Sequence, residues 1–82
     1  MSPNRILGKT LGEKLGVIFD YEFIEFIPTG RDSEYVFNTN KGKYKYISTG
    51  ELCTMHKFNG FQYELLEPNQ DIRISTLLNL KK

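Results

Sequence analysis

The run VIFDYEFIEFI, residues 17–27, is the longest apolar-rich stretch of the chain and sets the expected fold. Up to Phe23 its large apolar residues recur at a period of two, which is typical of a β-strand with two different faces. Beyond Phe23 the phase switches, because Ile24 and Phe26 fall out of step with the residues before them. A β-bulge or bend near Phe23 and Ile24 would restore the phase. We therefore predict a long strand here, at the centre of a curled sheet.

The length and composition indicate one small globular domain, residues 1–82. The chain has 39% hydrophobic and 26% charged residues, which suits a single hydrophobic core. No apolar run reaches the roughly 18 residues that span a bilayer. The first residues lack the pattern of a secretion signal, so we predict a cytoplasmic protein without a membrane association. The absence of alanine and tryptophan, beside many residues with AT-rich codons, suggests a low-GC bacterium or one of its phages.

Charge and cysteine content exclude some classes of protein. The formal net charge is +1, which gives no overall attraction to nucleic acid or to anionic membranes, although a local basic patch is compatible with it. Cys53 is the single cysteine, so the chain cannot form an internal disulfide.

A Leu-Gly pair recurs with a period of four at residues 7–8, 11–12 and 15–16. On a helix the leucines would form an apolar stripe, and the glycines a smooth strip suited to close packing on a sheet. Thr10 and Glu13 fit a capping box, so the alternative to a helix that includes Leu7 is one that begins only at Thr10. We expect a short helix over roughly residues 10–16 that is stable only when packed, because each glycine costs a helix roughly 1 kcal/mol.

Two hairpins follow the central run. The segments 34–39 and 43–48 alternate in apolar character on either side of the turn sequence Asn40-Lys41-Gly42. A second pair, 52–58 and 61–66, flanks Asn59-Gly60, for which we expect a type I′ turn.

The C-terminal part is less regular in pattern. Ile72 and Ile74 are expected to open a final strand, and the leucines after them fit either a further short strand or a helical turn. The expected fold class is α+β and mostly β: a five- to six-stranded antiparallel meander curled into a small half-open barrel, with a short N-terminal helix.

The sequence gives little support for a catalytic site or a metal site. Cys53 and His56 would point to opposite faces of a strand, and Cys-x-x-His supplies half of the four ligands usual for zinc. Asp20, Glu22 and Glu25 fit a solvated acidic strip, with an acidic contact surface for a basic partner as the functional alternative. We therefore predict no catalytic residue, no metal and no cofactor, and a protein that is not an enzyme.

The best candidates for a binding site lie in one segment of the chain. They are Lys41, Lys43, Tyr44, Lys45 and Tyr46. A strand would place the lysines on one face and the tyrosines on the other, whereas a single-stranded nucleic-acid platform needs cations and aromatic rings accessible together. The structural alternative is therefore a tyrosine pair in the core and a lysine strip in water.

By elimination, the sequence favours a small non-enzymatic binding protein that regulates or inhibits a protein partner, of phage or mobile-element origin. The aromatic content of 13% agrees with macromolecular contact. The alternative is a small β-barrel that binds nucleic acid through the lysine-tyrosine segment. A free strand edge would also allow a homodimer.

Overall fold

The computed structural model describes residues 3–68 and 70–80. Its elements, in chain order, are α1 (Pro3–Phe19), β1 (Phe23–Ile27), β2 (Glu34–Thr39), β3 (Gly42–Thr49), β4 (Leu52–Phe58), β5 (Tyr63–Pro68), a 3-10 helix η1 (Gln70–Ile72) and α2 (Ile74–Leu78).

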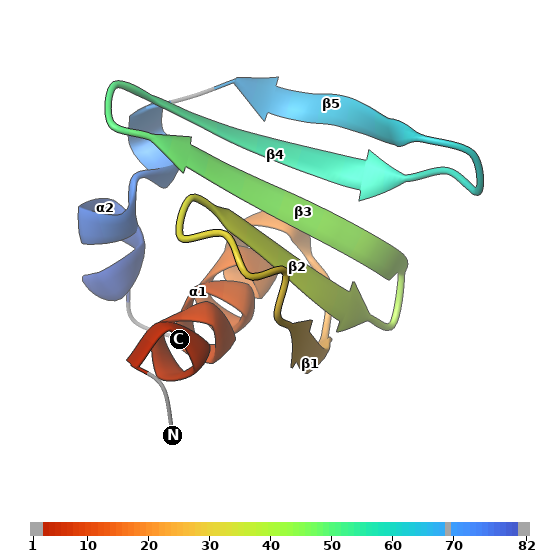
Figure 1. Ribbon diagram of the computed structural model, residues 1–82, viewed down its shortest axis with the longest axis horizontal. Helices are drawn as coiled ribbons and strands as arrows, with labels where there is room; N and C mark the ends of the chain where they lie inside the picture. Colours follow the sequence, from red (N-terminus) through yellow and green to blue (C-terminus); the bar gives the residue numbers. More distant parts are fainter. Residues whose placement is uncertain (1–2, 69, 81–82) are drawn as a thin grey trace.

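The five strands form an antiparallel meander in the order β1-β2-β3-β4-β5. The two end strands are edges that do not pair with each other, so the sheet is half-open, and α1 packs on one of its faces (Figure 1). The expected fold class is thus confirmed. Among the described residues, no helix combines the length and hydrophobicity that crossing a membrane would require.

The prediction of a central strand over residues 17–27 is wrong in two respects. The helix continues to Phe19, because Phe19 lies four residues after Leu15 and so satisfies the helical period as well as the strand period. Asp20 then adopts a left-handed φ of 57°, and the Tyr21 amide donates to the Gly16 carbonyl at 3.2 Å, the geometry of a helix C-cap. The remaining strand, β1, is an edge of the sheet rather than its centre.

The predicted β-bulge in this stretch is confirmed. Phe23 pairs with Thr39 and Glu25 pairs with Asn38, so Ile24 is the extra residue at the register shift. The bulge brings Phe23 and Phe26 to the same side of the strand, which resolves the phase change seen in the sequence.

The Leu-Gly repeat docks α1 on the sheet, as predicted. Leu11 and Leu15 are fully buried. A Cβ added to Gly12 would lie 2.5 Å from the ring of Phe23, so the absence of a side chain allows this close approach. The helix is longer than the expected residues 10–16, because packing on the sheet supports the first two turns as well.

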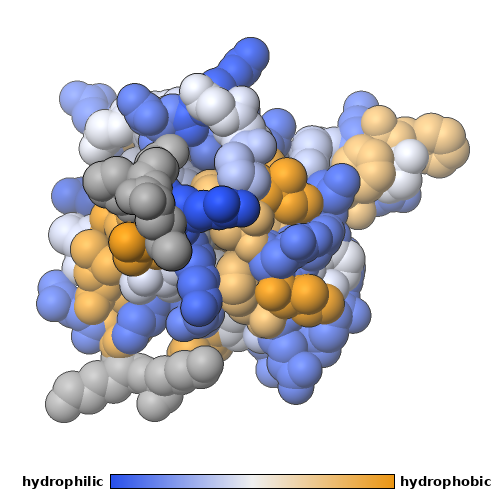
Figure 2. Space-filling view, turned by 60° about the horizontal axis from the view of Figure 1, so that its bottom comes forward, coloured by the Kyte–Doolittle hydropathy of each residue, from blue (hydrophilic) through white to orange (hydrophobic). Residues whose placement is uncertain are grey.

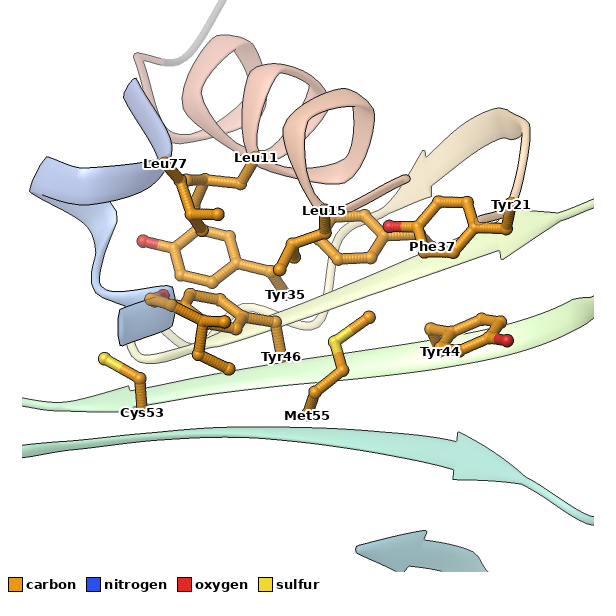
Figure 3. Close-up of a cluster of buried hydrophobic side chains, with 11 residues drawn as sticks. Leu11, Leu15, Tyr21, Tyr35, Phe37, Tyr44, Tyr46, Cys53, Met55 and Leu77 are labelled. Atoms are coloured by element: carbon orange, nitrogen blue, oxygen red, sulfur yellow. The ribbon is translucent and has the colours of Figure 1, made fainter. Parts of the chain in front are cut away.

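The core lies between α1 and the face of the sheet that we call the inner face (Figure 3). Its largest members are aromatic residues: Tyr35, Phe37, Tyr44 and Tyr46 of β2 and β3, and Tyr21 between α1 and β1. Two buried tyrosine hydroxyls donate to backbone carbonyls. The Tyr21 hydroxyl donates to the Gly12 carbonyl at 2.7 Å, and the Tyr46 hydroxyl donates to the Ile72 carbonyl at 2.5 Å. Both buried hydroxyl groups therefore have a hydrogen-bond partner inside the core.

Both predicted hairpins are present, with one change at the second. The loop between β4 and β5 holds four residues rather than a two-residue type I′ turn, because Asn59 Oδ1 accepts from the amides of Phe61 and Gln62. Strand β5 therefore begins at Tyr63 instead of Phe61.

The strand expected at Ile72 and Ile74 is wrong. This segment forms η1 and α2, whose residues Ile72 and Leu77 are buried in the core. Leucines that depart from strict alternation fit this helical turn, which was the alternative for the end of the chain.

Candidate binding surface on the outer face of the sheet

The outer face of the sheet is the face opposite α1. It is formed by the alternate residues of the strands that do not enter the core, among them Glu34, Val36, Asn38, Lys43, Lys45, Ile47, Thr54, His56, Phe58, Tyr63 and Leu65. Both described α-helices lie on the other side, with the core (Figure 3). One face of an antiparallel sheet commonly meets water and is then polar. Here it is instead a half-buried mixture of apolar, aromatic and basic side chains.

Two lysines of β3 lie over aromatic rings of β4 and β5 on this face. The ammonium of Lys45 is 4.2 Å from the ring centroid of Tyr63, and that of Lys43 is 5.8 Å from the centroid of Phe58. The two rings are themselves in contact, with centroids 5.2 Å apart. Each cation–aromatic contact of this kind contributes about 0.5–1 kcal/mol at an exposed site.

The structure separates the five candidate residues that the sequence brings together. Lys43 and Lys45 lie on the outer face, whereas Tyr44 and Tyr46 are buried on the inner face and present almost no surface to a partner. Lys41 lies in the β2–β3 turn, where its ammonium is 3.4 Å from the carboxylate of Asp20. Lys43 and Lys45 are half-buried against rings rather than fully in water, since their long side chains lie along the apolar surface, whereas Lys41 is exposed.

His56 lies on the same face, directly across from Lys45 in the strand register. Burial lowers the pKa of His56, and the positive charge of Lys45 lowers that pKa further. Its Nδ1 atom is buried and has no hydrogen-bond partner among the described residues. Burial also raises the pKa of the Tyr63 phenol, with a smaller contribution from the negative charge of Glu34.

The β4–β5 hairpin projects from the body of the protein (Figure 1). Phe61 in its loop is 95% exposed, and the neighbouring β5 residues Leu65 and Leu66 are 55% and 41% exposed. In the space-filling view of Figure 2, the end of this projection is coloured hydrophobic. Strand β5 is also an edge of the sheet, so no strand in the described part of the chain pairs with its free backbone edge.

The residues considered for catalysis remain apart. Cys53 is buried on the inner face and His56 lies on the outer face, which agrees with the geometry expected from their spacing. Within residues 3–68 and 70–80, no three His, Cys, Asp or Glu side chains are close enough to hold a metal ion. Asp20 and Glu22 lie outside the strands, at the turn between α1 and β1, and both are exposed.

A second surface feature is a groove of about 670 Å³ between α1 and β1. Its floor includes the rings of Phe23 and Phe26, and its rim includes Ile6 and Ile24, which are both exposed. Lys9 and Glu13 of α1 and Glu25 of β1 place both signs of charge along the groove, so its charge does not favour one kind of ligand.

Sequence reasoning missed the aromatic half of the outer-face site. Phe58, Tyr63 and His56 were assigned to a hairpin but not to a site, because they are distant in sequence from the lysines. The alternation of Phe61, Tyr63 and Leu65 places them on one face of the second hairpin, but it does not show that this face adjoins the lysines. Phe61 beside Asn59-Gly60 is a signal for an exposed ring in a loop.

Comparison with known proteins gives no assignment for this surface. No family model, no curated protein and no solved structure matches the chain.

Proposed function

We propose that this chain is a non-enzymatic binding protein that regulates or inhibits a protein partner through one contact surface. This contact surface comprises Lys43, Lys45, Phe58, Phe61, Tyr63 and Leu65. The single observation that carries the proposal is the projecting β4–β5 hairpin, whose loop holds Phe61 at 95% exposure.

The chemistry of the surface favours a protein over other partners. Single exposed apolar residues are common in folded proteins, but Phe61, Leu65 and Leu66 lie within six positions of one another on one projecting element. Aliphatic and aromatic side chains together match the apolar centre of a protein interface. A nucleic acid would leave the aliphatic side chains without an apolar partner.

A direct test compares the hairpin with a matched surface elsewhere. The test variant is Phe61→Ser with Leu65→Ser, and the control variant is Ile6→Ser with Ile24→Ser at the α1–β1 groove. Each immobilised protein is exposed to lysate of its native host, and a protein retained by the unmodified chain is purified for direct binding measurements.

The expected result is that the hairpin variant binds the purified partner at least about tenfold more weakly, as loss of interface anchors predicts. The groove variant should bind like the unmodified chain. Equal dissociation constants for the unmodified chain and the hairpin variant would refute the proposed surface.

One observation favours a second function, single-stranded nucleic-acid binding. Lys43 and Lys45 share the open face with Phe58 and Tyr63, so cations and rings are accessible together, which the two tyrosines of β3 could not provide. Binding to an oligonucleotide would then weaken steeply with rising salt, and a flat response would exclude this function.

A further inference from the structure

Among the residues that the structure describes, neither lysine of the contact surface has an acidic partner. Ion pairs on and near the sheet join Arg31 with Glu34 and Lys41 with Asp20. Lys43 and Lys45 form no ion pair with a carboxylate of the described residues. Their ammonium groups lie over Phe58 and Tyr63 instead. A carboxylate is a stronger partner for an ammonium than a ring face, so both lysines can exchange the ring for an incoming acid.

Two acids of this face, Glu34 of β2 and Glu25 of β1, contact groups other than Lys43 and Lys45. The carboxylate of Glu34 is 3.4 Å from the guanidinium of Arg31, and that of Glu25 accepts from the Asn38 amide at 2.7 Å. Neither acid is paired with Lys43 or Lys45, so the two ammonium groups are available to a carboxylate of a partner. This part of the face is complementary to an acidic surface rather than to a basic one.

Apolar side chains border this positive region on the β5 side. Leu65 is directly across from His56 in the register, and Phe61 lies beyond it in the hairpin loop. A partner that covers both regions must carry carboxylates beside apolar side chains.

We infer that the occupant of the contact surface is an acidic amphipathic segment of the partner protein. Its Asp or Glu carboxylates pair with Lys43 and Lys45, and its apolar side chains pack on Phe61 and Leu65. This inference rests on the proposed function and names the chemistry of the partner at that same surface.

The test uses probes of defined chemistry with the full chain. The first is a short synthetic peptide that, as a helix, carries Leu and Phe on one side and Glu on the other, and the second is the same peptide with Lys for every Glu. The third is an oligothymidylate of about twelve nucleotides, which covers the site size of a small single-strand platform. Binding is measured by fluorescence anisotropy at low and moderate salt.

The glutamate peptide should bind at least about tenfold more tightly than the lysine peptide. Lys43→Gln with Lys45→Gln should weaken its binding by about fivefold or more, mainly through the association rate. The matched control, Lys9→Gln with Lys41→Gln, removes the same charge elsewhere and should leave binding unchanged.

Equal binding of both peptides would overturn the acidic preference and leave the apolar contact of the proposed function standing. Binding of the oligothymidylate alone, with a steep salt dependence, would overturn both and establish the nucleic-acid function. Absence of binding by all three probes would also count against both.

Discussion

At the scale of single residues, Gly12 shows how one missing side chain sets the distance between α1 and the sheet. A Cβ at this position would lie 2.5 Å from the ring of Phe23 and 2.8 Å from that of Phe37, which is fully buried. Gly12→Ala should gain about 1 kcal/mol of helix propensity but lose about 1–3 kcal/mol to overpacking. We therefore expect a net decrease in the free energy of unfolding, measured by urea denaturation.

The control for Gly12→Ala is Thr10→Ala on the same helix. Thr10 is partly exposed and its hydroxyl bonds only to the preceding turn, so alanine there should change stability by less than about 0.5 kcal/mol. A Gly12→Ala protein more stable than the unmodified chain would show that α1 can move away from the rings at little cost.

His56 provides a second prediction at this scale, for the pH dependence of stability. Its pKa is lowered in the folded protein by burial and by Lys45, so the unfolded chain binds the proton more readily. The contribution of neutral His56 to the free energy of unfolding is fully present above the unfolded pKa of about 6.5. It is lost as the pH falls through that value toward the lower folded pKa.

When the pH is lowered from about 7.5 to about 5.5, the free energy of unfolding should therefore decrease less for His56→Gln than for the unmodified chain. Carboxylates that titrate in both proteins contribute equally, so the difference between the two reports His56. Identical losses in the two proteins would contradict the folded-state shift.

At the scale of elements, α1 is held by a stripe of leucines that enters the core. Leu15 is fully buried, so Leu15→Ala should reduce the free energy of unfolding by roughly 2–5 kcal/mol, through lost burial and the cavity left behind. Ile18 on the same helix is 44% exposed, and Ile18→Ala should cost far less. A loss below about 0.5 kcal/mol for Leu15→Ala, in denaturant melts, would mean that this face of α1 does not support the fold.

At the scale of the whole molecule, one hydrogen bond joins the middle of the sheet to the C-terminal helices. The Tyr46 hydroxyl donates to the carbonyl of Ile72 at 2.5 Å, and both residues are buried. Tyr46→Phe leaves that carbonyl without its donor and should cost about 1–3 kcal/mol. Hydrogen exchange should then accelerate in α2 before it does in β3, because the lost bond anchors the helical segment. Unchanged exchange in α2 would show that its apolar contacts hold it without this bond.

The sequence by itself determined the local elements of this fold. The Leu-Gly repeat specified a helix with a bare strip for close packing, and the phase change at Ile24 specified the bulge of β1. Turn residues positioned both hairpins, and alternation assigned Tyr44 and Tyr46 to one face and the lysines to the other. These features depend on neighbours within a few positions, which the sequence displays directly.

Only the tertiary structure decided which elements are neighbours and which residues far apart in the sequence are in contact. Phe19 satisfies both the helical and the strand period, and the packing of α1 on the sheet selected the helix. Strand order made β1 an edge, and the pairing of β3, β4 and β5 brought Lys45 to 4.2 Å from Tyr63. Such contacts depend on strand order and register over long sequence separations, and no local pattern encodes them. The aromatic half of the contact surface therefore became visible only in the folded protein.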